Sequence, residues 1–352
     1  MKYALALIAL VTVLAFAGGE FGTGCAEMFK ISGYNKAWIY MWGQDYADPD
    51  MSFRAYNWTA FQANLNDWVS GGVGLEFNSY SGNIDLQVCD AWLMGQLAPE
   101  FSLKAGQFKV PFGHAFTCSG GGIYFLDRAA LASTMDFGYY GGRDIGLNAH
   151  AQFDMVGIDL GLYNGNGAYM DSDTTTNMQF VAGVTLDAAD WMTFGAGVSM
   201  IGQPELEDTL GTTDSWSGTG IDAYLLVNYP VSETADLVFE GEYLNAGWAG
   251  PDYDGFTEEA GSDFYAMLGV KIGLEGFLSA IMPAVRYESL DPMELVADGG
   301  TNAEDKTTVI DFCLNFYNGD NHDIQLGGRN WGFENDNIDG YTDMYLGWRM
   351  RF

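Results

Sequence analysis

The C-terminal stretch 341–352 decides the fold, and it reads Tyr341-Thr342-Asp343-Met344-Tyr345-Leu346-Gly347-Trp348-Arg349-Met350-Arg351-Phe352. From Met344 to Phe352 an apolar residue stands at every second position, and the positions between them are mostly polar or glycine. Successive side chains of a β-strand point to opposite faces. The stretch therefore predicts a strand with one face for hydrocarbon and one face for water.

The same alternation recurs along most of the chain, for example over 145–151, 192–200, 264–272 and 310–316. None of these segments has the 3.6-residue period of a helix. The pattern predicts about sixteen strands, the size of a porin, although the first two alternate weakly and leave their register open. The expected strands span 29–43, 52–64, 69–79, 83–96, 101–112, 140–153, 157–165, 177–187, 191–202, 220–230, 235–247, 262–273, 277–289, 306–317, 322–333 and 341–352.

The connections between these strands alternate between short and long, and the longest spans 113–139. Short turns at one end and long loops at the other are typical of barrels in the outer membrane. In lipid every backbone N–H and C=O must pair internally, so the sheet has to close. We expect an all-β fold, a transmembrane antiparallel β-barrel with a long third loop folded into the pore. A soluble β-sandwich is the alternative, and it would not produce this alternation of loop lengths.

The N-terminus has the features of a secretion signal. Lys2 is followed by an apolar stretch, 4–16, and then by the small-residue site Gly24-Cys25-Ala26. We expect a signal peptide over 1–26, a barrel domain over 27–352, and localisation in the outer membrane of a Gram-negative-type bacterium. An earlier cleavage site at Ala15-Phe16-Ala17, an uncleaved anchor and a lipoprotein site at Cys25 are the alternatives.

The formal net charge is −33, with only 14 Lys and Arg residues. Nucleic-acid binding needs concentrated basic residues, so nucleic acid is excluded as a partner. The cysteines show no C-x-x-C spacing, and we predict no metal and no cofactor. Acidic loops such as 252–259 suggest Ca²⁺ bridges to lipopolysaccharide, but turn chemistry explains their Asp-Gly pairs better. We expect outer-membrane lipid and lipopolysaccharide as surroundings.

Several motifs around the predicted third loop resemble one family. They are the segment 106–113 (Gly-Gln-Phe-Lys-Val-Pro-Phe-Gly), the Asp127-Arg128 pair, the segment 141–146 (Gly-Gly-Arg-Asp-Ile-Gly) and the segment 163–167 (Tyr-Asn-Gly-Asn-Gly). Over about residues 100–170 the chain resembles the phosphate-selective porin family. The resemblance implies a sixteen-stranded trimeric porin with a constriction from the third loop. The final Phe352 likewise resembles the terminal aromatic residue that acts as an assembly signal in outer-membrane barrels.

Lys109, Arg128 and Arg143 are the candidate constriction residues. They would present positive charge where low-dielectric walls strengthen the field. The alternative is that Arg128 and Arg143 pair with nearby carboxylates and simply hold the loop. Both roles are compatible in one residue.

Strand parity also places charged residues on the inward face. Those of the later strands could form a basic stripe opposite an acidic wall, or could pair with each other and stiffen the barrel. If the lumen follows the net charge, the pore prefers cations weakly. The lumen candidates are Glu240, Glu242, Arg286, Arg329, Arg349 and Arg351.

The predicted function is a water-filled channel for passive diffusion of small hydrophilic solutes or ions, with phosphate or other anions passing a third-loop constriction. A structural or adhesive barrel without an open pore is the alternative. An enzyme is disfavoured, since the chain has three histidines and only His114 lies near a serine, Ser119. Conductance across a planar bilayer distinguishes a channel from a closed barrel.

Overall fold

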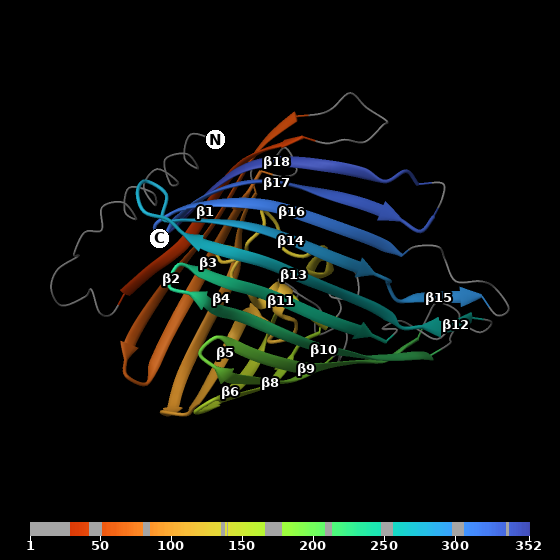
Figure 1. Cartoon of the computed structure of the whole chain (residues 1–352). Coiled ribbons are helices and arrows are strands. Elements are labelled where there is room, and N and C mark those ends of the chain that lie inside the picture. The colour runs from red at the N-terminus through yellow and green to blue at the C-terminus, as the bar shows by residue number, and fades with distance from the viewer. Residues whose placement is uncertain are drawn as a thin grey trace.

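Sixteen strands close into an antiparallel barrel in the computed structural model of the chain (Figure 1). The structure describes residues 29–41, 51–79, 85–134, 138, 140–165, 178–207, 213–247, 256–297, 306–335 and 338–352. The expected signal peptide lies outside these ranges. The barrel strands are β1 (Phe29–Met41), β2 (Met51–Asn66), β3 (Val69–Asn78), β4 (Asp85–Ala98), β5 (Phe101–Lys109), β6 (Arg143–Phe153), β7 (Val156–Tyr163), β8 (Met178–Ala189), β9 (Met192–Glu207), β10 (Thr213–Ser232), β11 (Ala235–Ala246), β13 (Gly261–Gly273), β14 (Ala280–Leu290), β16 (Thr307–Asn318), β17 (His322–Phe333) and β18 (Tyr341–Arg351).

The barrel closes where the first strand meets the last. β1 pairs with β18 in antiparallel fashion, with Tyr34 opposite Arg351 and Met41 opposite Met344. Beyond this register, Gly33 and Phe352 exchange two backbone hydrogen bonds, of 2.9 and 3.0 Å. A closed ring of strands leaves no unpaired edge, which is the condition for a sheet in lipid. The predicted all-β transmembrane barrel of about sixteen strands is confirmed.

The side-chain alternation read from the last strand holds in the structure. On β18, Leu346 and Trp348 are exposed on the outer face, whereas Tyr345 and Arg349 are buried on the inner face. On the weakly alternating first strands, Tyr34 and Trp38 are buried and Tyr34 lies opposite Trp58 of β2. Pairing with both neighbours thus settles a register that the sequence pattern left open.

Several strand boundaries differ from the prediction, and three of them have a clear structural reason or extend a hairpin. β5 ends at Lys109 rather than 112, because Pro111 has no N–H to donate to a ladder and Val110 N donates instead to the carbonyl of Gly142, at 2.9 Å. β9 extends to Glu207 and β10 begins at Thr213, so this hairpin is longer than expected. The backbone pairing of β9 with β10 extends into the expected loop, where apolar and polar residues do not alternate in the sequence.

Two short strands were not predicted. β12 (Phe256–Glu259) and β15 (Glu294–Ala297) pair into a separate two-stranded sheet built from two of the long loops. Strands of this length carry too little periodicity to be recognised in sequence. The helical turns α3 (His114–Thr117) and η1 (Ala130–Ser133) both lie between β5 and β6. Among the described residues, no helix has the length and apolar character needed to cross a membrane.

Candidate functional site: the third loop and the cavity beside it

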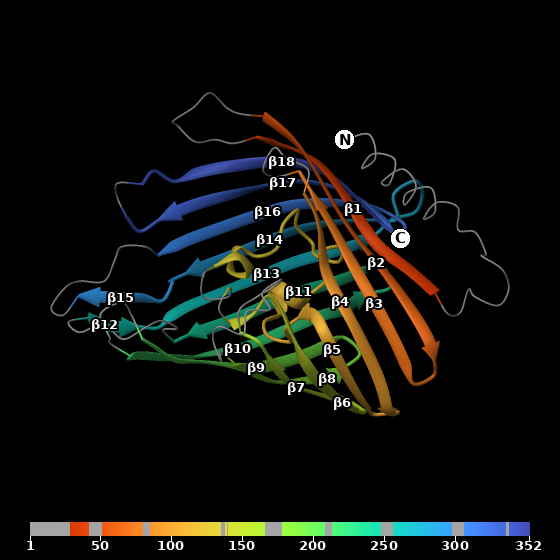
Figure 2. The same ribbon diagram turned by 180° about the vertical axis from the view of Figure 1, so that it is seen from behind.

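The described part of the third loop, residues 110–134, 138 and 140–142, lies inside the barrel and contacts several of its strands (Figure 2). Its Ala115 N–H donates to Glu242 of β11 at 2.6 Å. On another side, Lys36 of β1 donates from Nζ to the carbonyl of Leu126, also at 2.6 Å. Because inward-facing residues of β1 and β11 both bind the loop, its backbone is held across the lumen.

Four arginines attach the loop to one part of the barrel, which we call the clamp wall: β14, β16, β17 and β18. Arg286 and Arg329 both donate to the carbonyl of Arg128, at 3.0 and 3.1 Å. Arg349 donates to the carbonyl of Ile123 at 2.5 Å, and Arg351 donates to that of Gly121. A guanidinium offers five donors in a rigid fork, so one side chain can bind a loop carbonyl and a carboxylate together.

These four arginines are also paired with carboxylates of the same wall. Arg286 contacts Asp311 and lies 3.0 Å from Glu288, and Arg329 lies 2.6 Å from Asp311. Arg349 and Arg351 share Asp323, at 2.9 and 2.8 Å. The geometry follows the pairing alternative, in which these charges stiffen the wall, because each arginine already has a carboxylate at contact distance.

The two predicted lumen glutamates lie on β11. Glu242 is buried and accepts the N–H of Ala115, so it anchors the loop rather than facing open water. Glu240 is half-buried and lies opposite Met267 of β13. Neither forms an ion pair among the described residues, and Glu242 acts through a backbone hydrogen bond instead.

The three candidate constriction residues come together around one ring. Lys109 at the end of β5, Arg128 of the third loop and Arg143 at the start of β6 lie 5.1, 5.7 and 5.9 Å from the ring centroid of Phe116. A cation near an aromatic face is attracted by the ring quadrupole. Residues far apart in sequence thus form a cation cluster, defined as Lys109, Arg128 and Arg143.

Each member of the cation cluster is held differently. Lys109 Nζ donates to the carbonyls of Phe116, Thr117 and Cys118, at 2.6, 3.3 and 3.0 Å, which end the α3 turn. Arg143 pairs with Asp90 at 3.0 Å and lies 3.9 Å from Glu76. Arg128 donates to the carbonyl of Ala115 at 2.8 Å and contacts Cys118 Sγ at 3.0 Å. Among the described residues Arg128 forms no ion pair with a carboxylate.

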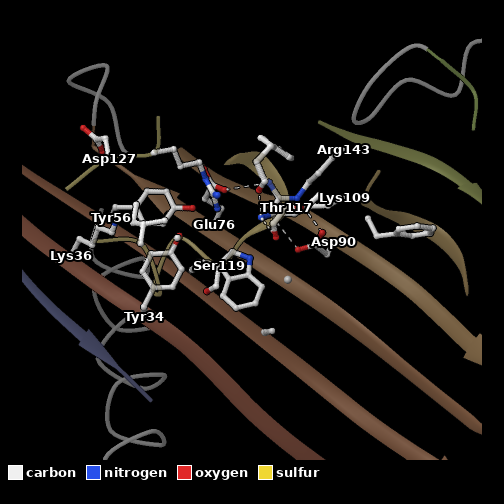
Figure 3. Close-up of a pocket in the computed structure, with 18 of the residues that line it drawn as sticks. Tyr34, Lys36, Tyr56, Glu76, Asp90, Lys109, Thr117, Ser119, Asp127 and Arg143 are labelled. Atoms are coloured by element: carbon white, nitrogen blue, oxygen red, sulfur yellow. Dashed lines mark hydrogen bonds and ion pairs between the residues drawn. The ribbon is translucent and has the colours of Figure 1, made fainter. Parts of the chain in front are cut away.

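A cavity of about 970 Å³ lies between the third loop and the opposite part of the barrel, which we call the open wall: β1 to β5. The cation cluster lines it from one side, and Glu76 and Asp90 line it from β3 and β4. Figure 3 shows Tyr34 and Tyr56 on one side of this cavity and the Arg143–Asp90 pair on the other. The cavity is therefore bordered by both signs of charge.

Sequence reasoning missed the aromatic part of the lining. Tyr34 stacks on Tyr56 with ring centroids 5.5 Å apart, and lies 6.1 Å from Trp58. Tyr34 also packs against Gly120, where an added Cβ would come within 2.3 Å of the tyrosine hydroxyl. The alternation Tyr34, Lys36, Trp38 was the available signal, but inward aromatic residues obscured the usual contrast between the two faces.

His114 and Ser119, the histidine and serine weighed as a possible catalytic pair, lie in different surroundings. The His114 ring lies 5.1 Å from that of Tyr224 on β10, whereas Ser119 lines the cavity near the open wall. Burial and the nearby charges of Arg128 and Lys109 lower the pKa of His114 to about 4. Within the described ranges, no cluster of three or more His, Cys, Asp or Glu side chains is placed to hold a metal ion.

Comparison with known proteins agrees with this geometry. The model of the family described as phosphate-selective porin O and P matches residues 56–248. No curated protein sequence matches the chain. OprB of Pseudomonas putida is 9% identical, with a TM-score of 0.65, over 96% of this chain and 97% of that chain. The outer membrane channel DcaP of Acinetobacter baumannii is 13% identical, with a TM-score of 0.61, over 92% and 97%.

A third solved structure, in-vitro folded OmpT of Vibrio cholerae in a trimer form, is 12% identical, with a TM-score of 0.55, over 92% of this chain and 100% of that chain. At such identities the likeness shows the barrel fold. The family match covers more than half of the sequence and includes the third loop. The chain belongs to the phosphate-selective porin O and P family and is an outer-membrane channel for small solutes.

Proposed function

We propose that solutes cross the barrel through the cavity beside the open wall, and that the cation cluster makes this passage favour small anions such as phosphate or chloride. The observation that supports the proposal is the convergence of Lys109, Arg128 and Arg143 on Phe116 at the edge of that cavity. Six cationic side chains and three carboxylates line the cavity, so the local balance is positive. They are Lys36, Lys104, Lys109, Arg128, Arg143 and Arg329, and Glu76, Asp90 and Asp127. Low-dielectric walls strengthen such a local field.

The net charge of −33 would by itself favour cations over anions. Exposed charges farther away than the Debye length of about 8 Å are largely screened at physiological salt. The arginines and carboxylates of the clamp wall are paired, so they add little to the field in the cavity. The cation cluster should therefore decide selectivity, and a weak cation preference that follows the net charge is the competing hypothesis.

The same geometry supports a channel rather than an enzyme. The one histidine near a serine in the sequence, His114, contacts Tyr224 of β10, whereas Ser119 lines the cavity and His114 does not. A nucleophile and its base must lie within hydrogen-bond reach. We further propose that the channel is a homotrimer embedded in outer-membrane lipid and lipopolysaccharide, in line with the trimer form of its Vibrio cholerae structural neighbour.

A reversal potential in a KCl gradient tests the proposal. The purified channel in a planar bilayer should pass chloride more readily than potassium, and Arg128→Gln should lower the chloride-to-potassium permeability ratio severalfold. Lys306→Gln is the matched control, because Lys306 has the same charge but a side chain that is 46% exposed in an outer loop. Cation selectivity of the unmodified channel would contradict the proposed anion preference, and absence of conductance would favour a structural or adhesive barrel.

A further inference from the structure

A second cavity, of about 340 Å³, lies between the third loop and β7 to β10, the strands at the lower side of the barrel in Figure 2. Among the described residues, only Lys109 and Thr117 line both this cavity and the cavity beside the open wall. We call it the acidic cavity, because its charged lining consists of Asp159 of β7, Asp222 of β10 and Lys109. The third loop therefore borders two spaces whose charged linings differ.

The positive charge of Lys109 is directed towards the other cavity. Its Nζ donates to the three carbonyls that end the α3 turn, and it lies 5.1 Å from the ring centroid of Phe116. Phe116 lines the cavity beside the open wall and not the acidic cavity. On the neighbouring strand β11, Glu242 lies opposite Tyr224 and forms no ion pair among the described residues. The carboxylates therefore dominate the field in the acidic cavity.

The two aspartates stand at the ends of one row that crosses four strands. Asp159 lies opposite Gly183 of β8, and Asp222 lies opposite Gly197 of β9. The two glycines lie opposite each other. Neighbouring strands are about 4.8 Å apart, so three such steps separate the two aspartate backbones by about 14 Å. The glycines leave the wall between the carboxylates without side chains, which makes room for an ion together with its water.

Asp222 carries a buried oxygen atom that lacks a partner. The side chain is 2% exposed, and the N–H of Gly113 donates to its carboxylate. The Oδ1 atom has no hydrogen-bond partner among the described residues. An added Cβ at Gly197 would clash with this atom, so Oδ1 lies over the glycine that lines the cavity. Because a buried carboxylate oxygen without a partner is strongly disfavoured, a ligand in the cavity would stabilise it.

Asp159 offers a second oxygen at the other end of the row. Asn148 Nδ2 and His150 Nδ1 of β6 both contact its Oδ1, at 2.8 and 3.1 Å. Its Oδ2 forms no hydrogen bond or ion pair among the described residues, and the side chain is 24% exposed. Between the aspartates, the hydroxyl groups of Thr185 and Tyr224 line the cavity 3.3 Å apart. Carboxylate and other oxygen atoms are the ligands that hard cations prefer.

We infer that the acidic cavity binds a hydrated divalent cation, such as Mg²⁺, between Asp159 and Asp222. Two carboxylates match its charge, and Mg²⁺ loses water reluctantly, so it is usually held through one or two carboxylates while several waters remain. Within the described ranges, no three acidic, histidine or cysteine side chains are placed to hold a metal ion directly. That arrangement agrees with a cation that keeps its water. Binding there does not require the anion preference proposed for the other cavity.

Fe²⁺ used in place of Mg²⁺, with ascorbate and hydrogen peroxide, tests this site, because hydroxyl radicals formed at bound iron cut the nearby backbone. In the full chain purified in detergent, mass spectrometry should find cuts near Asp159 and Asp222, and excess Mg²⁺ should suppress them. Asp222→Asn should reduce these cuts about tenfold, as expected for the loss of one charged partner. Glu76→Gln removes a carboxylate from the other cavity and should leave them unchanged.

Two outcomes would overturn the inference. Cuts confined to the outer loops would show that the acidic surface binds cations and that the acidic cavity does not. Cuts near Asp222 that persist at full strength in Asp222→Asn would show that this carboxylate does not hold the cation.

Gly197→Ala keeps every charge and provides a second test for the case in which Asp222→Asn disturbs the third loop. The added methyl group covers Oδ1 of Asp222, so the Fe²⁺ concentration at half-maximal cutting should rise about tenfold. Gly202→Ala is the matched control on the same strand, because an added Cβ there meets nothing within 4 Å. If the two alanine variants were cut alike, the cation would not be held over Gly197 and the inference would fail.

Discussion

The clamp wall and the open wall use the same residue types for opposite purposes. On the clamp wall, Arg349 and Asp323 are each only 1% exposed and are paired at 2.9 Å. Beside the open wall, Arg143 at the start of β6 lies 3.9 Å from Glu76 of β3, and these side chains are 16% and 20% exposed. A charge pair in a dry environment holds structure, whereas a looser pair beside water leaves its field available to solutes. Whether a charged pair holds the loop or acts on passing solutes therefore depends on its access to solvent and not on its residue types.

The largest effect should come from removing a buried clamp arginine. Arg286→Met leaves Glu288 without its cation and Asp311 with only Arg329, and it leaves the carbonyl of Arg128 with Arg329 as its one remaining arginine donor. Breaking a buried pair from one side costs about 3–5 kcal/mol. Urea unfolding in detergent, followed by tryptophan fluorescence, should show this loss, and open-channel current noise should increase as the loop loosens.

The control for Arg286→Met is Lys271→Met, because Lys271 is inward-facing and only half-buried over the ring of Tyr317. The free energy of unfolding of the control should fall by less than about 1 kcal/mol, as is usual for exposed charges. If the two variants proved equally stable, the clamp wall would not differ from other lumenal charges, and the comparison between the walls would fail.

A smaller effect is expected for Asp323→Asn, which keeps the shape of the side chain but removes the charge shared by Arg349 and Arg351. Hydrogen bonds to charged groups contribute about 1.5–3 kcal/mol each, and Arg349 keeps its bond to the Ile123 carbonyl. We therefore expect a loss of about 2 kcal/mol in the free energy of unfolding. A change in ion selectivity without a change in stability would place Asp323 in the filter instead.

Glu76→Gln sharpens the comparison from the open wall. Its carboxylate is partly exposed and lies at the limit of an ion pair with Arg143, so stability should change by less than about 1 kcal/mol. Removing one of the two carboxylates that face the cation cluster should raise the chloride-to-potassium permeability ratio. A reversal-potential measurement checks the permeability ratio, and an unfolding curve checks the stability. A large loss of stability would mean that charged pairs beside the open wall also hold the structure together.

The last expected effect appears only on acidification, as a pH dependence of stability that arises from the third loop. The pKa of His114 lies at about 4 in the folded protein, below its ordinary value of 6.5. Between these values the unfolded chain binds the proton and the folded chain does not, so stability falls as the pH falls from 6.5 towards 4. His114→Gln should make this decline shallower.

Carboxylates also titrate in this range, so the measurement has to be a difference between variants. His150→Gln is the matched control, since His150 lies 3.1 Å from Asp159 on the barrel wall, outside the third loop. Unfolding midpoints at several pH values should separate His114→Gln from both the control and the unmodified channel. Identical curves for all three would show that His114 is not buried in the way the structure indicates.

The candidate site was predicted in part. Lys109, Arg128 and Arg143 were named from loop motifs, and the structure brings them around Phe116. The stacked Tyr34 and Tyr56 were missed, because inward aromatic residues look like outward ones in a pattern of apolar and polar residues. The partners of the arginines were also beyond prediction, since Arg286 and Asp311 are brought together only by the register of β14 on β16.

The sequence by itself determined the barrel, the number of its strands and the inward or outward direction of most side chains. These properties are local, because a strand repeats every two residues and its neighbours in the chain decide which face is apolar. Only the tertiary structure decided which charges are paired, where the third loop is attached and which wall borders the open cavity. Those outcomes depend on contacts between residues far apart in sequence, and no local pattern records the distance between two side chains or the water between them.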